Sequence, residues 1–78
     1  MIAELLEYLA RQLVDEPDAV RVEQVEEDDD TLLLRLHVAQ DDLGKVIGRK
    51  GRIARALRTV VRASSARERR RVQLEIVD

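Results

Sequence analysis

All three glycines of this 78-residue chain fall within one octet, Gly44-Lys45-Val46-Ile47-Gly48-Arg49-Lys50-Gly51. The last two bracket two cations at the point where an amphipathic, arginine-rich helix is predicted to begin. Glycine leaves no side chain between the main chain and a ligand, and the first turn of a helix offers unpaired N–H groups to an anion. The octet therefore predicts a loop between two helices that can hold a phosphate chain against bare backbone and positive charge.

Two longer stretches, residues 2–14 and 52–66, repeat apolar side chains at the spacing of an amphipathic helix. The apolar stripes are Ile2, Leu5, Leu6, Leu9 and Leu13 in the first stretch, and Ile53, Ala54, Leu57, Val60 and Val61 in the second. Pro17 is expected to end the first helix, because proline disfavours helical geometry in the residue before it. Asp41 and Asp42 offer an N-cap to a short helix over residues 43–47.

Alternation of apolar and polar side chains predicts three strands, over residues 19–25, 31–39 and 71–76. Leu33 adds an apolar side chain to the second face of the middle strand, which indicates a central or partly covered position. Residues 26–30 are all acidic, too polar for either regular element, and are predicted to form a hairpin loop.

A short hairpin pairs two strands antiparallel, whereas a helical crossover favours a parallel pair. We therefore predict an α+β fold for a single domain over residues 1–78, in the order helix, strand, strand, helix, helix, strand. The sheet is expected to be three-stranded and mixed, with the helices packed on one face. A chain of this length lies near the lower limit for one hydrophobic core, so help from dimerisation or a partner is plausible.

The net charge of -2 hides an uneven distribution along the chain. Residues 1–42 hold thirteen acidic and three basic side chains, whereas residues 43–78 hold eleven basic and three acidic ones. Partners respond to local fields rather than to the total charge, so the basic half is compatible with a polyanion. The alternative is that the two halves simply neutralise each other in the fold.

The chain lacks the residues that several functional classes need. The chain has no cysteine, which excludes disulfides and thiolate metal sites. Its one histidine, His37, is predicted at the surface of a strand, so we expect no catalytic residue, no metal and no cofactor. The octet does not match the P-loop spacing. No signal peptide or membrane-spanning segment is apparent, and a cytoplasmic location is the expectation.

The segment Val46-Ile47-Gly48-Arg49-Lys50-Gly51-Arg52-Ile53 resembles the signature of KH domains, whose G-x-x-G loop clamps the backbone of about four nucleotides. The order of elements resembles the type II form of that fold. The short length, the leading helix and the run from Asp42 to Gly48 are most similar to the bacterial KhpA (YlqC) family. This resemblance implies a non-catalytic binder of single-stranded RNA, acting as a post-transcriptional regulator or RNA chaperone. It also implies a homodimer, or a heterodimer with a larger Jag-type KH protein, and no small-molecule substrate.

The resemblance and the chemistry of the octet together assign eight residues to RNA binding: Lys45, Ile47, Gly48, Arg49, Lys50, Gly51, Arg52 and Arg55. Gly48 and Gly51 shape the clamp at residues 48–51, Arg49 and Lys50 hold phosphate, and the others border the groove. Two changes are expected to leave the fold intact and abolish binding: Gly48→Asp alone, and Arg49→Asp together with Lys50→Asp.

Some features leave alternatives open. Arg58 and Arg62 either continue a phosphate track or form the solvated face of a helix, and the basic run at 67–71 is either an exposed connection or a contact surface. Tyr8 is the only aromatic residue, so a stacking platform is a poor description and weak sequence preference is expected. The rival functions are a protein-interaction module that docks through the first helix, and a binder of single-stranded DNA.

Overall fold

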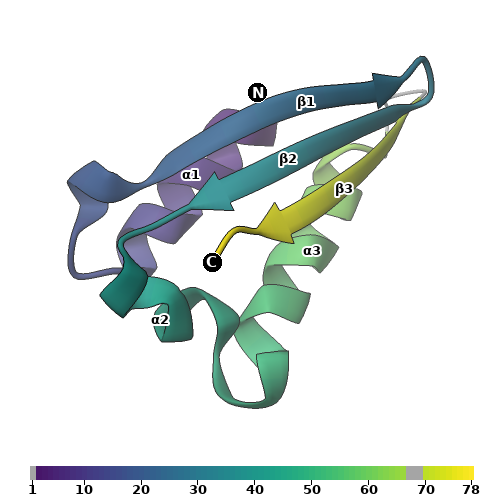
Figure 1. Ribbon diagram of the computed structural model, residues 1–78. Coiled ribbons are helices and arrows are strands. Elements are labelled where there is room, and N and C mark those ends of the chain that lie inside the picture. The colour runs from purple at the N-terminus through teal and green to yellow at the C-terminus, as the bar shows by residue number, and fades with distance from the viewer. Residues whose placement is uncertain (1, 67–69) are drawn as a thin grey trace.

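In the computed structural model, which describes residues 2–66 and 70–78, helices and strands follow the predicted order. The helices are α1 (Ile2–Leu13), α2 (Leu43–Ile47) and α3 (Arg52–Ser64), and the strands are β1 (Arg21–Asp28), β2 (Thr31–His37) and β3 (Arg71–Ile76). Figure 1 shows α1 and α3 against one face of the sheet, with α2 beyond the end of β2. The predicted α+β fold, with its helices on one face, is confirmed.

Within the described residues the sheet has three strands in the order β1-β2-β3. β1 pairs antiparallel with β2, and β3 pairs parallel with β2. The mixed sheet is therefore confirmed, and so is the central position that Leu33 indicated for its strand. The crossover through α2 and α3 places the glycine octet at one end of the molecule and leaves β3 as an edge strand beside α3 (Figure 1).

The hydrophobic core lies between the inner face of the sheet and the helices. Leu34 and Leu36 of β2 are fully buried, together with Leu6 of α1 and Val46 of α2. Each buried side chain of this kind contributes roughly 1.5–3 kcal/mol relative to an exposed one. Because Val46 belongs to the octet, its burial anchors α2 and fixes where the following loop begins.

The acidic run at residues 26–30 differs from the loop that was predicted. β1 continues to Asp28, and only residues 29–30 form the turn before β2. Glu26 lies opposite Leu32 and Asp28 opposite Thr31, with a register shift between them. β1 is an edge strand, and the acidic side chains at residues 26–28 are exposed to water, so their charge does not oppose strand pairing. The loop prediction was wrong because charge excludes a buried strand but not a solvated edge.

Asp42 does not cap α2, contrary to the prediction from its position. Its carboxylate is buried and accepts hydrogen bonds from the backbone N–H groups of Asp15, at 3.2 Å, and Glu16, at 3.1 Å. Burial raises the pKa of the Asp42 carboxyl, but these donors and the nearby Lys45 ammonium outweigh burial and hold the pKa below its ordinary value. Asp42 therefore ties the segment after α1 to the start of α2 instead of satisfying the N–H groups of α2.

Candidate nucleic-acid interface

Residues 48–51 form a tight turn between α2 and α3. Gly48 has φ 76° and ψ 167°, Lys50 has φ 58° and ψ 23°, and Gly51 has φ 74° and ψ 18°. The N–H of Gly48 donates to the carbonyl of Gly44 at 2.9 Å, and the N–H of Gly51 donates to the carbonyl of Gly48 at 3.0 Å. With three left-handed residues out of four, the chain reverses direction in a loop that projects from the lower end of the molecule in Figure 1.

Gly48 is required by packing as well as by its backbone angle. A Cβ at this position would lie 2.7 Å from Cγ1 of Ile53 and 2.9 Å from its backbone nitrogen. Contacts this short do not occur with a real Cβ, so a side chain here must displace the start of α3. The geometry argues against the expectation that Gly48→Asp leaves the fold intact. Replacement of Arg49 and Lys50, both exposed, is the cleaner way to alter the loop.

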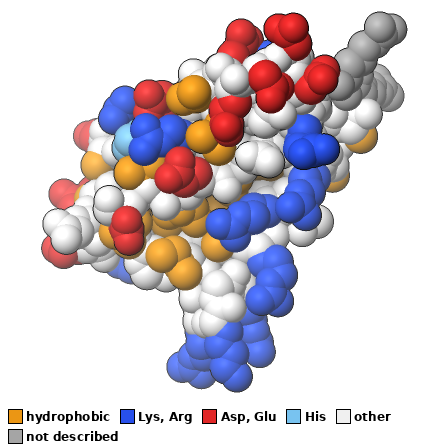
Figure 2. All heavy atoms as spheres, turned by 45° about the vertical axis from the view of Figure 1, so that its right-hand side comes forward, with side chains coloured by type: hydrophobic (Ala, Val, Ile, Leu, Met, Phe, Trp, Pro, Cys, Tyr) orange, Lys and Arg blue, Asp and Glu red, His pale blue; other side chains and the backbone are white. Residues whose placement is uncertain are grey.

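Cations on the loop and α3 lack acidic partners among the residues that the structure describes. These uncompensated side chains are Arg49, Lys50, Arg52, Arg55, Arg58 and Arg62, whereas the cations that form salt bridges are Arg11, Arg35, Lys45 and Arg70. Figure 2 shows Lys and Arg gathered on the projecting tip and along the adjoining side, with Asp and Glu gathered at the opposite end. Mutual neutralisation of the two halves therefore does not account for this part of the basic surface.

Lys45 and Ile47, both on α2, are also among the residues predicted to bind RNA, but they differ in whether the side chain is free to contact a ligand. The Lys45 ammonium forms a hydrogen-bonded ion pair with Asp15 and lies 3.5 Å from the Asp42 carboxylate. The hydrogen bond that the Lys45 ammonium donates to the Asp15 carboxylate raises the pKa of Lys45. Ile47 is 38% exposed beside the loop, where it offers apolar surface. The structure thus brings Ile47 to the loop, whereas Lys45 is engaged in the contact between α2 and the segment after α1.

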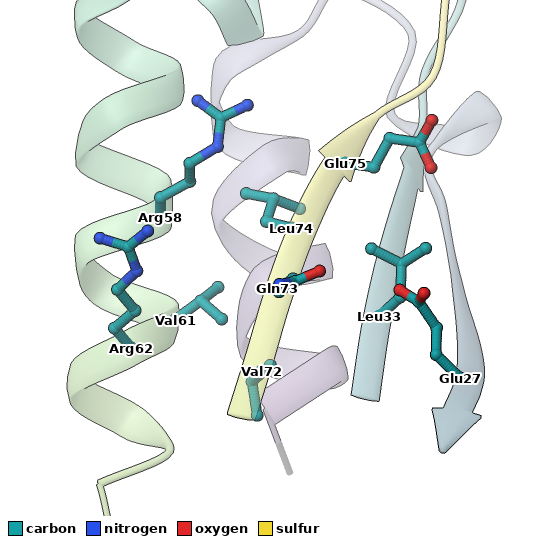
Figure 3. Close-up of a pocket in the computed structure, with 9 residues that line it drawn as sticks. All are labelled: Glu27, Leu33, Arg58, Val61, Arg62, Val72, Gln73, Leu74 and Glu75. Atoms are coloured by element: carbon teal, nitrogen blue, oxygen red, sulfur yellow. The ribbon is translucent and has the colours of Figure 1, made fainter. Parts of the chain in front are cut away.

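A groove of about 420 Å³ runs between α3 and the edge strand β3 (Figure 3). Its lining consists of Glu27, Leu33, Arg58, Val61, Arg62, Val72, Gln73, Leu74 and Glu75. Arg58 and Arg62, whose role the sequence left open, form its helix wall. The residues of β3 were not among the predicted site residues, although the parallel pairing that sets this strand beside α3 was predicted.

The basic run before β3 is only partly described. Arg70 donates to Glu26 at 2.8 Å, and the backbone N–H of Arg71 donates to the carbonyl of Asp30 at 2.6 Å. Both contacts join the start of β3 to the acidic hairpin. Residues 67–69, the rest of that run, lie outside the described residues.

His37 lies on the outer face of the sheet, as predicted, with its Nε2 3.1 Å from the Glu23 carboxylate. Over residues 2–66 and 70–78, no three His, Asp or Glu side chains are grouped as metal ligands. Over the same ranges, no helix is long and apolar enough to cross a membrane.

The order of elements and the mixed three-stranded sheet of the described residues define a KH domain of type II. Comparison with known proteins agrees: a family model described as "KhpA/KhpB, KH domain" matches residues 3–76. The chain belongs to this KhpA/KhpB family of KH domains.

Relatives match the chain over nearly its whole length. RNA-binding protein KhpA of Borreliella burgdorferi is 51% identical over 75 residues, covering 96% of this chain and 90% of that protein. The protein of the same name in Treponema pallidum is 49% identical over 78 residues, covering 100% of this chain and 96% of that protein. The one in Bacillus subtilis is 44% identical over 77 residues, covering 99% and 94%.

Proposed function

We propose that this chain is a non-catalytic RNA-binding protein. It clamps the backbone of a short single-stranded RNA segment in the loop at 48–51 and the adjoining groove, and acts as a post-transcriptional regulator or RNA chaperone. The observation that carries the proposal is the run of uncompensated cations beside a glycine-bracketed loop. Membership of a family whose relatives are named RNA-binding proteins supports it.

The roles of the loop residues follow from their positions. Gly48 and Gly51 leave the main chain open to a phosphate, and the unpaired N–H groups at the start of α3 favour an anion. Arg49 and Lys50 project from the loop and supply charge-assisted hydrogen bonds to phosphate oxygens. Ile47 offers an apolar contact for a sugar or base, and Arg52 and Arg55 continue the basic surface along α3. Lys45 serves chiefly to position α2, because two carboxylates hold it.

The test is fluorescence anisotropy of a labelled, mixed-sequence single-stranded RNA titrated with wild type and with the Arg49→Asp, Lys50→Asp variant. Aspartate tolerates the left-handed region that Lys50 occupies, so the variant is expected to fold, as circular dichroism will check. Each phosphate contact contributes roughly 0.7 to the log–log salt slope for single strands. Loss of both contacts is therefore expected to reduce the slope by about 1.4 and to weaken binding strongly.

Arg11→Asp combined with Arg21→Asp is the matched control. It changes the net charge equally, on α1 and β1, and leaves the loop untouched. If the control loses as much affinity as the loop variant, binding follows net charge alone and the loop assignment fails. Competition between RNA and DNA oligomers of one sequence tests the ligand class, and equal affinity for both would favour the single-stranded DNA alternative.

A specific observation also favours pairing with a second KH domain. Leu5, Tyr8 and Val60 are exposed, and Leu9 and Leu13 of α1 face Ile53, Ala56 and Val60 of α3 across an apolar hollow of about 270 Å³. The leading helix thus carries leucine surface that the sheet does not cover. An apolar patch of this kind on a small domain marks an interaction site. We assign it to a homodimer, with a heterodimer with a larger KH protein of the family as the second possibility.

Analytical ultracentrifugation of wild type and Val60→Glu tests the pairing. A charge in the patch is expected to convert the dimer to a monomer without unfolding α3, because Val60 is already partly exposed. Thr59→Glu is the matched control, since it adds the same charge one residue away on an exposed position. A wild type that stays monomeric at high concentration, or a Val60→Glu protein that stays dimeric, would contradict this assignment.

A further inference from the structure

The two helices on either side of the loop at 48–51 are held in place by different means. α3 is thirteen residues long and is anchored in the core by Ala54, Leu57 and Val61, all of them buried. α2 is five residues long, too short to be stable by itself, and is anchored in the core by Val46. The orientation of α2 therefore depends on the contacts that are made at its first turn.

A buried carboxylate makes those contacts. Asp42 is 2% exposed, lies directly before α2, and accepts hydrogen bonds from the N–H groups of Asp15 and Glu16, which are 27 and 26 residues earlier in the chain. The Lys45 ammonium lies 3.5 Å from the same carboxylate and is paired with the Asp15 side chain. Figure 1 shows the connection after α1 beside the start of α2. We call these contacts the Asp42 tie.

The Asp42 tie acts on the first half of the loop. Ile47 and Gly48 follow Lys45 closely in the chain, and the N–H of Gly48 donates to the carbonyl of Gly44 at 2.9 Å. A rotation of α2 would therefore carry Gly48 away from Ile53, which packs so closely that a Cβ on Gly48 would lie 2.7 Å from its Cγ1. A ligand binds more weakly when only part of the population has the competent arrangement. A tie that orders α2 before RNA arrives thus raises the affinity.

We infer that Asp42 is a positioning residue for RNA binding, which holds α2 and the first half of the loop in the arrangement that accepts phosphate. The inference rests on the proposed function, because it concerns the affinity of the same loop for RNA. Electrostatics alone gives the opposite expectation. Removal of a negative charge close to the loop would strengthen the attraction of the protein to a polyanion.

The test is fluorescence anisotropy of a labelled, mixed-sequence RNA octamer with wild type, Asp42→Asn and Asp41→Asn, at a temperature where circular dichroism shows each protein to be folded. One hydrogen bond to a charged group corresponds to a factor of about ten or more in an equilibrium. Asp42→Asn is therefore expected to bind about fivefold to tenfold more weakly than wild type. A merely structural role would leave the affinity of the folded protein unchanged.

Asp41→Asn is the matched control, because it removes the same charge one residue away, from an exposed side chain. It is expected to bind RNA at least as tightly as wild type. Asp15→Asn is the second variant, in case Asp42→Asn does not fold, since the Asp15 side chain is 78% exposed. It breaks the pair with Lys45, and it is expected to weaken binding about twofold even though it frees a cation for RNA.

A second measurement is NMR hydrogen exchange at the N–H groups of Asp15 and Glu16, which is expected to slow when the octamer is added, because coupling between two sites is reciprocal. Wild-type affinity in folded Asp42→Asn, an equal loss in Asp41→Asn, tighter binding by Asp15→Asn, or unchanged exchange would each overturn the inference and leave the proposed function standing. Failure of wild type to bind the octamer would instead overturn the proposed function, and this inference with it.

Discussion

Replacing Lys50 with glycine separates the conformational cost of the loop from its charge. Lys50 is the one non-glycine residue with positive φ in the described chain, at φ 58° and ψ 23°. A side chain in this region costs about 1–2 kcal/mol, whereas the greater freedom of glycine in the unfolded chain costs about 0.5–1 kcal/mol. Subtracting the lower ends and the upper ends of the two ranges in turn, we expect Lys50→Gly to raise the free energy of unfolding by about 0.5–1 kcal/mol.

Thermal unfolding followed by circular dichroism measures this gain. For a domain of this size, 1 kcal/mol shifts Tm by about 4–8 °C, so Lys50→Gly is expected to raise Tm by about 2–8 °C. Arg49→Gly is the matched control, because Arg49 is the adjacent cation and has negative φ. The control is expected to lower stability by about 0.5–1 kcal/mol. If Lys50→Gly melts no higher than wild type, the left-handed conformation carries no cost and the reasoning is refuted.

The same variant is expected to bind RNA less well even though it is more stable. Loss of one phosphate contact reduces the log–log salt slope by roughly 0.7. Lys50→Asn separates the two effects, since asparagine tolerates the left-handed region but carries no charge. It is expected to bind as weakly as Lys50→Gly. Binding at wild-type strength by either variant would show that the Lys50 ammonium does not contact phosphate.

Two further predictions concern the supports of the loop. Gly48→Ala is expected to lower the urea midpoint of unfolding more than Gly51→Ala. A Cβ at Gly48 would meet the Ile53 nitrogen at 2.9 Å, whereas a Cβ at Gly51 would have nothing within 4 Å. Equal losses would show that this contact relaxes freely. The pKa of Asp42 is lowered on folding, so the unfolded chain takes up its proton at higher pH and stability is lost as pH falls through the folded pKa. Asp42→Asn is therefore expected to lower the free energy of unfolding at neutral pH. It is also expected to reduce the loss of stability as pH falls, measured by urea titrations between about pH 7 and 3. A pH dependence identical to that of wild type would contradict this role.

Most of the fold could be predicted because the apolar positions repeat with the period of the element that contains them. Leu34 and Leu36 alternate along β2 and are buried, and Leu6 is buried on the inward stripe of α1. The two errors both involve carboxylates. A list of acidic side chains does not reveal whether they point into water, as on β1, or meet backbone N–H groups of a distant segment, as Asp42 does. Those outcomes depend on tertiary packing.

In the candidate interface, too, features formed by adjacent residues could be predicted, whereas those that depend on distant residues could not. The loop at 48–51 could be predicted because its glycines, its cations and the start of α3 are adjacent in the sequence. Lys45 belongs to the same octet, but its partner Asp15 lies 30 residues away, so its ion pair could not be foreseen. The groove between α3 and β3 was missed as well. Val72 and Leu74 were predicted as apolar positions of a strand, but their alternation alone does not show that they line a groove beside Arg58 and Arg62.

The loop itself supplies an argument for a ligand that does not depend on resemblance. A turn that only joined two helices would be most stable with glycine or asparagine at position 50, and with acidic side chains near its cations. Instead a lysine occupies the left-handed region, and Arg49 and Arg52 beside it have no acidic partner in the described residues. In the core, each residue type suits the conformation and burial that the structure gives it. In the loop at 48–51, the lysine at position 50 does not suit its left-handed conformation. Such disagreement is typical of functional sites, and a bound phosphate would supply the missing countercharge.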